Sequence, residues 1–343
     1  MIKLSIITIN YNNAEGLRKT LASVAAQTYP NIEHIIVDGG STDGSVEIIR
    51  EYADNQAKGE RLEAKGTENS KADTLASTLY TLHLTPSAHI VRWISEPDKG
   101  IYNAMNRGIE VALGKRVVND DHTSSPNSLI ASSPLASGYI QILNSGDILA
   151  ADDVTERMMA ALASYSEQCE RSTGEAELQQ SDLPTILYGN MIKVNAAGKV
   201  VGKSGYTEYS LRQFYSSTLN HDCAYIRRDL FEEYGLYDEQ LKIVSDWKWY
   251  LQAIGLGRVK PEYVDIDVTI FDDGGISETN LALRYAERRK ILEEVLPPAV
   301  LWDYDTHAFE MEQMKRLRRW KLYGLVYFIE RVCFKLEKWF GRR

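Results

Sequence analysis

The sequence predicts an α/β protein with a mostly parallel central sheet flanked by helices, followed by a helical extension at the C-terminus. Short apolar runs alternate with segments of helical spacing, an order that favours parallel strands joined by right-handed crossovers. Several of these runs end in loops rich in Gly, Asn, Ser and Asp. Near the C-terminus, apolar residues recur at helical spacing, which predicts the extension.

Composition limits the classes of protein. The 343 residues, 44% of them apolar, suggest one large domain with an appendage or two domains, and the net charge of −9 argues against nucleic-acid binding. Cys169, Cys223 and Cys333 match no zinc or redox spacing. The apolar run from Leu4 to Ile9 is too short for a signal peptide, and nothing approaches 18 consecutive apolar residues. We expect a cytoplasmic protein that does not span a membrane.

The first elements are expected to be strand, helix, strand and helix. Residues 4–9 form an apolar run, and the segment after it has helical spacing. Residues 35–37 are β-branched and are followed by two glycines that allow a tight turn. The next helix can be capped by a side-chain oxygen of Ser41, Thr42 or Asp43. The expected buried positions of the two helices are Leu17, Leu21 and Val24, then Val46, Ile48 and Ile49.

Further along the chain, strands are expected near 90–94, 139–143 and 185–194, with a helix over 100–114 whose inward positions include Ala104, Ile109 and Ala112. Three polar stretches interrupt this pattern, and we interpret them as insertions at 54–88, 115–137 and 166–184. The expected domains are 1–265, divided into halves at about residue 150, and the extension at 280–343.

Three of the expected strands end in loops that carry an acid, namely Asp38, Asp98 and Asp147. In an open α/β sheet, ligands bind outside the carboxyl ends of the strands. An Asx-type turn before a helix cap is an alternative explanation for Asp38 alone. Three acids at one edge instead suggest a polar ligand or a divalent cation. A pyrophosphate bridged by Mg²⁺ or Mn²⁺ would neutralise both sides.

Four ordered blocks resemble the family 2 glycosyltransferases of the bacterial cell-surface polysaccharide type. They are SIITINYNNAEGLRKTLASVAAQTYPNIEHIIVDGGSTDGS, SEPDKGIYNAMNRGIEVALG, YIQILNSGD and HDCAYIRRDLFEEYGLYDEQLKIVSDWKWYL, within residues 1–260. The resemblance implies a GT-A fold, a nucleotide-diphospho-sugar donor with UDP-sugar as the expected one, a divalent metal (Mn²⁺ or Mg²⁺) and inversion at the anomeric carbon. The first half would bind the donor, and the second half would bind a saccharide or lipid-linked acceptor.

The resemblance also assigns roles to residues by position. Thr8 and Tyr11 would line the nucleotide pocket, and Asp38 would accept a hydrogen bond from the base, with Ser41 and Asp43 shaping its loop. Asp98 and Lys99 would approach the ribose and diphosphate, supported by Asn103 and Asn106.

The metal site departs from the family pattern. NSGD, residues 144–147, stands where the family has DxD, which leaves Asp147 as the only carboxylate of the motif and the first candidate metal ligand. His221 is the second candidate, although a lone histidine is more often a structural hydrogen-bonding residue.

For catalysis, the family's ED-like motif corresponds to Asp246 in IVSDWKWYL. A carboxylate whose pKa is raised in a partly closed site could take the proton of the attacking acceptor hydroxyl. The alternative role for Asp246 is a helix N-cap, and the two roles can coexist.

Three other functions are less consistent with the sequence. A Rossmann dehydrogenase lacks support because NYNNAEG, not a glycine fingerprint, follows the first strand. A sugar-nucleotide pyrophosphorylase would need a glycine-rich basic loop near its start. A non-catalytic nucleotide-sugar-binding protein on a degenerate scaffold gains weight from the reduced DxD motif, but the four retained acids argue against it.

The C-terminal tail is basic, whereas the rest of the chain is acidic. Residues 315–343 hold ten Lys or Arg against Glu330 and Glu337, a net charge of +8, which leaves −17 for the first 314 residues. An apolar stripe at helical spacing comprises Leu317, Trp320, Phe328, Val332, Leu336 and Trp339. This pattern predicts an amphipathic helix on the inner face of the cell membrane. The alternative is a helix packed on the domain or on the second subunit of a homodimer.

Overall fold

The computed structural model describes residues 1–58, 89–116, 138–173, 183–195, 197–272, 280–319 and 323–340. The chain divides into two compact units, residues 1–287 and residues 288–343. The first unit contains the sheet, and the second contains the C-terminal helices.

The elements alternate as expected in the first part of the chain. They are β1 (Lys3–Asn10), α1 (Ala14–Ala25), β2 (Ile32–Asp38), α2 (Ser45–Lys58), β3 (Ile90–Ser95), α3 (Ile101–Ala112), β4 (Gly138–Ile142), β5 (Ile148–Leu149) and α4 (Val154–Thr173). After these come β6 (Ile186–Val194), β7 (Val200–Lys203), α5 (Leu211–Ser216), β8 (Ala224–Arg227), α6 (Leu230–Glu233), α7 (Ser245–Tyr250), the π-helical segment η3 (Leu251–Leu256), β9 (Glu262–Asp272), α9 (Leu281–Val295), α10 (Pro298–Arg318) and α11 (Tyr323–Phe340).

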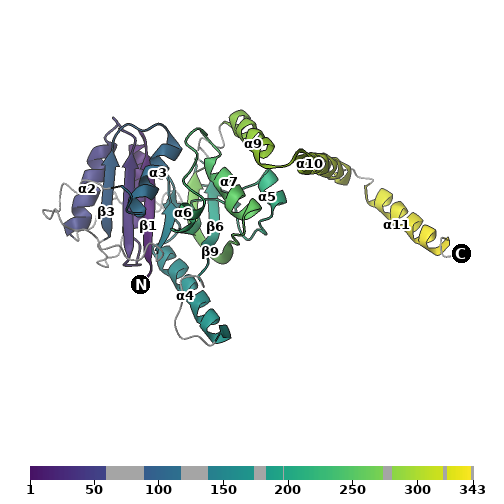
Figure 1. Ribbon diagram of the computed structural model, residues 1–343, viewed down its shortest axis with the longest axis horizontal. Coiled ribbons are helices and arrows are strands. Elements are labelled where there is room, and N and C mark those ends of the chain that lie inside the picture. Colours follow the sequence, from purple (N-terminus) through teal and green to yellow (C-terminus); the bar gives the residue numbers. More distant parts are fainter. Residues whose placement is uncertain are drawn as a thin grey trace. The chain divides into compact units, whose positions relative to one another are not determined.

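The described strands form one mixed sheet in the order β3-β2-β1-β4-β8-β6-β9-β5, with β7 paired to β6 (Figure 1). β1 pairs in parallel with β2 and β4, and β2 pairs in parallel with β3. β8 is antiparallel to both β4 and β6. The parallel order expected for the first half is therefore confirmed, and the second half adds antiparallel strands.

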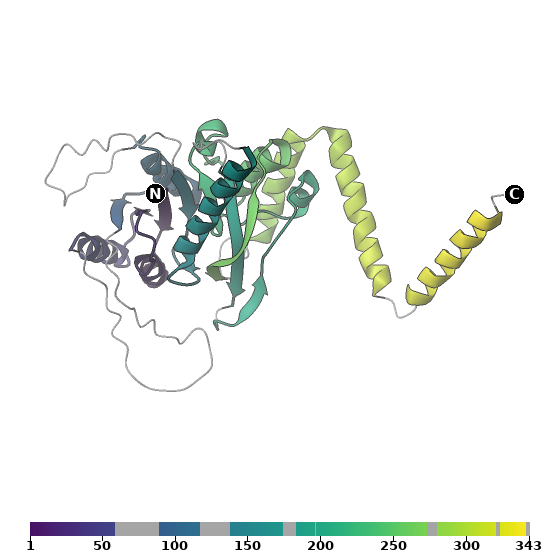
Figure 2. The ribbon, with the colours of Figure 1, turned by 90° about the horizontal axis from the view of Figure 1, so that it is seen from below.

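Helices cover both faces of the sheet (Figures 1 and 2). On one face, α1 and α2 pack on β2 through a cluster of Leu17, Leu21, Ile36, Ile48, Ile49 and Tyr52. Met158 and Leu162 of α4 belong to a second buried cluster, which also contains Leu187 of β6. On the other face, α3 approaches β1 so closely that a Cβ at Gly108 would lie 2.4 Å from Ile7 Cγ2. The expected inward residues of α3, Ala104, Ile109 and Ala112, are buried.

The expected insertions fall mainly outside the described residues. Residues 54–58 continue α2 and residues 166–173 continue α4, whereas 59–88, 117–137 and 174–182 are not described. The predicted stripe of the tail is shared between α10, which contains Leu317, and α11, which contains Phe328, Val332, Leu336 and Trp339; Trp320 lies outside the described residues. The expectation of one continuous helix through this stripe is therefore wrong. None of the described helices is long and apolar enough to cross a membrane.

Candidate active site

Asp38 ends β2 at the carboxyl edge of the parallel strands and has no exposed surface. Its Oδ1 accepts hydrogen bonds from Asn10 Nδ2 (2.8 Å) and Ser41 Oγ (2.6 Å). Its Oδ2 accepts from the backbone N–H groups of Gly40 (3.1 Å) and Ser41 (2.9 Å) and from Ser95 Oγ (2.8 Å). Burial alone would raise the pKa of Asp38, but the hydrogen bonds from Ser41, Asn10 and Ser95 lower it.

These contacts show that Asp38 holds its loop, because the buried carboxylate accepts five hydrogen bonds inside the protein. Its expected contact with a nucleotide base stays a prediction. Asp43 fixes the same loop from the other end, since it accepts from the backbone N–H of Ala14 (2.8 Å) and from Ser45 Oγ (2.6 Å). Ser41 Oγ accepts from the backbone N–H of Asn12 (2.8 Å).

Tyr11, which is exposed, and Asp98, which is half-buried, both lie close to the buried Gly39 at this corner. A Cβ added to Gly39 would lie 2.5 Å from Asp98 Oδ2 and 3.1 Å from Tyr11 Cδ2. The Tyr11 ring is 64% exposed and is free to stack on a flat ligand. Thr8, in contrast, is fully buried and its hydroxyl lies 2.9 Å from His34 Nε2. The Thr8 side chain thus faces the core, and its expected place in a nucleotide pocket stays a prediction.

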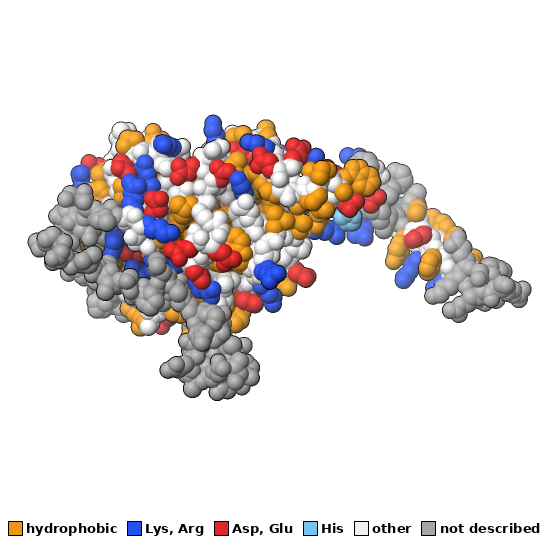
Figure 3. All heavy atoms as spheres, viewed as in Figure 1, with side chains coloured by type: hydrophobic (Ala, Val, Ile, Leu, Met, Phe, Trp, Pro, Cys, Tyr) orange, Lys and Arg blue, Asp and Glu red, His pale blue; other side chains and the backbone are white. Residues whose placement is uncertain are grey.

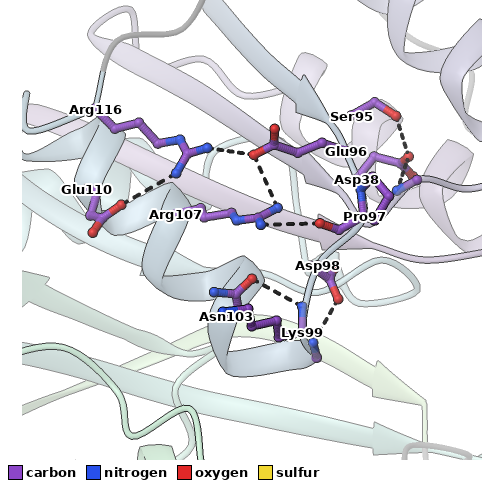
Figure 4. Close-up of polar contacts among 12 residues, drawn as sticks. Asp38, Ser95, Glu96, Pro97, Asp98, Lys99, Asn103, Arg107, Glu110 and Arg116 are labelled. Carbon is purple, nitrogen blue, oxygen red and sulfur yellow. Dashed lines mark hydrogen bonds and ion pairs between the residues drawn. The ribbon is translucent and has the colours of Figure 1, made fainter.

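The loop after β3 leads directly into α3 (Figure 4). Asp98 Oδ1 accepts from the backbone N–H of Gly100 (2.8 Å), and Asn103 Oδ1 accepts from that of Lys99 (3.2 Å). Gly100 has φ 122°, a left-handed conformation that favours glycine. Glu96 pairs with Arg107 (3.3 Å) and the loop is thereby held against α3. Asp98, Lys99 and Asn103, which are expected near the ribose and diphosphate, thus lie together at the N-terminal end of α3.

Asn103 and Asn106 connect α3 to the second half of the domain. Asn103 Nδ2 donates to Glu239 Oε2 (2.9 Å), and Asn106 Nδ2 donates to Glu239 Oε1 (3.0 Å). Asn106 also exchanges two hydrogen bonds with the backbone of Tyr237 (2.8 and 2.9 Å). Asn106 is buried, so its role here is to tie α3 to the segment before α7.

Asp246 lies in the first turn of α7 and is held by two side chains. Its Oδ1 accepts from the hydroxyl of Tyr102 in α3 (2.8 Å), and its Oδ2 lies 3.2 Å from His221 Nδ1. Val244 occupies the N-cap position, so Asp246 is not the N-cap. The side chain keeps 14% of its surface exposed. α3 therefore brings the loop of Asp98 and the carboxylate of Asp246 to the same site.

The expected rise in the pKa of Asp246 is not found. Burial raises this pKa, but the hydrogen bond and charge of His221 and the hydrogen bond from Tyr102 lower it below the ordinary value. Burial lowers the pKa of His221, but the hydrogen bond and charge of Asp246 and the charges of Asp222 and Asp147 raise it to about 9. The pair is consequently an imidazolium and a carboxylate at neutral pH.

Both ring nitrogens of His221 face polar side chains, and its expected role as a metal ligand stays a prediction. Its Nδ1 faces Asp246, and its Nε2 lies 3.1 Å from Asn144 Nδ2. A protonated imidazole has two donors and no acceptor, and Asn144 Oδ1 is buried without a partner. A flip of the Asn144 amide would let this oxygen accept from Nε2. The alternative role of His221, structural hydrogen bonding, fits this geometry.

Asp147 is the first candidate metal ligand. It is 5% exposed, its carbonyl accepts from Thr20 Oγ1 (2.7 Å), and Gly146 before it has φ 111°. Across the described residues, no three Asp, Glu, His or Cys side chains are grouped to hold a metal by themselves. Mg²⁺ is usually held by one or two carboxylates together with substrate phosphates, a donor set to which Asp147 could contribute.

Several site residues were missed at the sequence level. Asn10 and Ser95 bind Asp38, Tyr102 binds Asp246, and Glu239 joins Asn103 to Asn106. Asn10 and Ser95 each end a strand beside Asp38, so strand register could have indicated them. Tyr102 and Glu239 are 144 and 7 residues from Asp246 in the chain, and no local pattern pairs them.

Comparison with known proteins finds similarity to glycosyltransferases. Residues 5–71 match the family described as Glycosyl transferase family 2. A PGL/p-HBAD biosynthesis glycosyltransferase of Mycobacterium bovis (strain BCG / Pasteur 1173P2) is 24% identical over 285 residues, which cover 83% of this chain and 82% of that protein. The uncharacterized glycosyltransferase YibD of Escherichia coli (strain K12) is 33% identical over 115 residues, 34% of this chain and 24% of YibD.

Among solved structures, TarS 1-349 of S. aureus superposes with a TM-score of 0.50 and 17% sequence identity, covering 87% of this chain and 68% of that one. The fold and the sequence matches together indicate a glycosyltransferase. The chain is similar to glycosyltransferase family 2 over residues 5–71, and its fold matches that of GT-A structures.

Proposed function

We propose that this chain is an inverting hexosyltransferase that moves a sugar from a nucleotide-diphospho-sugar, with UDP-sugar as the expected donor, to a hydroxyl of a saccharide or lipid-linked acceptor in cell-surface polysaccharide synthesis. The observation that carries the proposal is the hydrogen bond from Tyr102 to Asp246. Tyr102 lies four residues after Asp98, so one short segment serves both the donor loop and the carboxylate.

In this proposal, the Tyr11 ring stacks on the base, and Asp98 and Lys99 approach the ribose and diphosphate. Asp246 accepts the proton of the acceptor hydroxyl as that oxygen attacks the anomeric carbon and the nucleotide diphosphate leaves from the opposite side. A carboxylate has about four lone-pair sites, so Asp246 can accept this hydrogen bond in addition to those from Tyr102 and His221. Because its pKa is lowered, Asp246 is ionised and ready to accept at neutral pH.

Asp147 would hold Mn²⁺ or Mg²⁺ together with the donor diphosphate. Such a cation, when bound, neutralises negative charge that develops on the leaving phosphate. The nearby imidazolium of His221 would add positive charge to the same region. Arg107, which is turned to Glu96 and the carbonyl of Pro97, supports the loop and is not assigned to the diphosphate.

The proposal is tested by calorimetry of UDP binding, with Mn²⁺ and then with EDTA, together with an assay of UDP-sugar hydrolysis. We expect UDP to bind, EDTA to weaken binding, and Asp147→Ala to remove the effect of EDTA. UDP binding that is unchanged by EDTA and by Asp147→Ala would refute the metal assignment. Binding without any hydrolysis or transfer would instead favour the non-catalytic binding protein.

We also propose that α11 attaches the chain to the anionic inner face of the membrane. Apolar side chains of α11 are exposed, as Figure 3 shows, and they include Leu325, Val326, Tyr327, Phe328, Ile329, Val332, Phe334 and Leu336. Arg331 and Lys335 lie among them, within a tail of net charge +8. Exposed aromatic and basic residues on one helix suit an interface of acyl chains and anionic headgroups.

A further inference from the structure

A polar cluster on β6, β7 and β9 lies outside the site described above. Asn190 is 1% exposed, and its Nδ2 donates to Asp265 Oδ1 and to Asp267 Oδ1, both at 2.9 Å. The Tyr263 hydroxyl donates to Asn190 Oδ1 (2.8 Å). Lys203 Nζ lies 2.6 Å from Asp267 Oδ1. We call these five residues the Asn190 cluster.

A bulge in β9 brings the two carboxylates of the cluster together. Tyr188 pairs with Tyr263 and Asn190 pairs with Asp267, so β9 advances further than β6 between the two pairs. β6 and β9 lie so close together at this point that a Cβ at Gly189 would lie 2.5 Å from the Ile266 carbonyl oxygen. Bulges beside active sites often turn side chains toward a ligand.

The cluster is connected to the active site through β9. Asp267 is two residues before Thr269, a spacing of about 7 Å along a strand. The Thr269 hydroxyl donates to Asp222 Oδ2 (2.9 Å), and Asp222 is buried next to His221 in the chain. His221 in turn contacts Asp246. Short contacts therefore lead from the Asn190 cluster to the carboxylate assigned to proton transfer.

A row of aromatic rings follows the same path. Neighbouring ring centroids are 5.4 to 5.7 Å apart along Tyr206, Tyr263, Tyr188, Tyr209 and Phe214. At the inner end, the Phe214 carbonyl accepts from Trp247 Nε1 (2.9 Å), next to Asp246 in α7. At the outer end, Tyr206 is 70% exposed. This ring offers a flat apolar surface beside fixed polar groups.

The exposed Tyr206 ring beside the Asn190 cluster suits a sugar better than a cation. A pyranose has an apolar C–H face that packs on an aromatic ring and hydroxyls that donate to carboxylates and accept from amide or ammonium groups. Hydrogen bonds from Asn190 and Tyr263 lower the pKa of Asp265, so it stays an acceptor at neutral pH. Lys203 already neutralises Asp267, which makes the pair a poor cation site.

We propose that the Asn190 cluster and the exposed ring of Tyr206 bind a sugar residue of the acceptor, away from the hydroxyl that Asp246 serves. This inference rests on the proposed function, since it gives that acceptor a saccharide part. The site would fix the register of the acceptor chain through stacking and hydrogen bonds, while the reacting end lies at Asp246.

The test uses the full chain, saturated with UDP so that the donor site is filled. Saturation-transfer NMR measures binding of methyl glycosides of glucose, galactose, mannose, rhamnose and N-acetylglucosamine. Tyr206→Ala should lower the saturation-transfer signal of the bound glycoside about five-fold, which is the loss expected for one stacking contact. Asp265→Asn should lower it as well. The matched control is Tyr285→Ala, because Tyr285 in α9 is also strongly exposed, at 61%.

UDP affinity should be the same in wild type and in all three variants. The sugar site is overturned if Tyr206→Ala and Tyr285→Ala give equal saturation-transfer signals. It is also overturned if no glycoside gives a saturation-transfer signal with the wild type. Failure of wild type to bind UDP counts against the proposed function instead, so the two failures are distinguishable.

Discussion

Asp246 is the residue on which the proposed chemistry depends. Asp246→Asn keeps the shape of the side chain and an oxygen that can accept from Tyr102, but it removes the base. We therefore expect transfer to fall by about 10² to 10⁴, while UDP affinity stays within a few-fold. Steady-state kinetics and calorimetry measure the two quantities. Near-normal turnover of this variant would mean that another group takes the proton.

His221 and Asp246 form a pair whose charge depends on pH. The folded pKa of His221 is raised from 6.5 to about 9, so its stabilisation is fully present below pH 6.5 and is lost as pH rises through 9. For His221→Asn, the loss in free energy of unfolding relative to wild type should therefore shrink over that range. Urea denaturation of both proteins at a series of pH values measures this difference in free energy of unfolding.

Tyr102→Phe is the matched control for this pH dependence. It removes one hydrogen bond to Asp246 and leaves the imidazolium in place, so its cost of about 1 kcal/mol should change little between pH 6.5 and 9. If the cost in free energy of unfolding changed equally with pH in both variants, the pH dependence would not come from His221.

At the scale of elements, the site depends on how closely the β2–α2 and β3–α3 loops approach each other. Gly39→Ala would place a Cβ 2.5 Å from Asp98 Oδ2 and 3.1 Å from the Tyr11 ring. Both side chains can move outward, so the free energy of unfolding should change by less than about 1 kcal/mol. UDP affinity should fall about ten-fold, because the two groups leave the positions in which they meet the ligand.

The control for Gly39→Ala is Gly202→Ala in β7, where the added Cβ would meet only Lys193 Cβ at 3.9 Å. Calorimetry of UDP binding compares the two variants, and thermal denaturation shows whether each is folded. An unchanged UDP affinity in Gly39→Ala would indicate that Tyr11 and Asp98 do not line the nucleotide pocket.

At the scale of the whole molecule, we propose that the acidic first part of the chain binds the donor and acceptor and that the basic tail binds anionic lipid. The full chain should sediment with anionic vesicles of phosphatidylglycerol and phosphatidylcholine, and added salt should weaken this binding. Replacing Phe328 and Phe334 in α11 by Glu should abolish sedimentation and leave UDP binding intact. Trp302→Glu in α10 is the control, because Trp302 is similarly exposed.

Equal vesicle binding by the control and the Phe328/Phe334 variant would contradict the membrane proposal. A dimer in wild type that the same two substitutions convert to monomer, measured by sedimentation velocity without vesicles, would support packing on a second subunit instead.

The sequence by itself determined the alternation of strands and helices, the parallel first half of the sheet and the resemblance to family 2 glycosyltransferases. These features depend on local periodicity and on turn residues that must follow one another in the chain. It also indicated Asp38, Asp98 and Asp246, because each lies in a conspicuous motif. Ser41 and Asp43 make hydrogen bonds within the loop, and capping and Asx turns of this kind use neighbouring residues.

The tertiary structure decided what each of these side chains touches. Asp38 is buried in hydrogen bonds from β1, β3 and its own loop, and Thr8 faces His34 because strand alternation and the neighbouring strand select its direction. The lowered pKa of Asp246 results from Tyr102 and His221, which the chain brings from 144 and 25 residues away. Such contacts depend on helix packing and strand pairing between distant segments, and no local pattern specifies them.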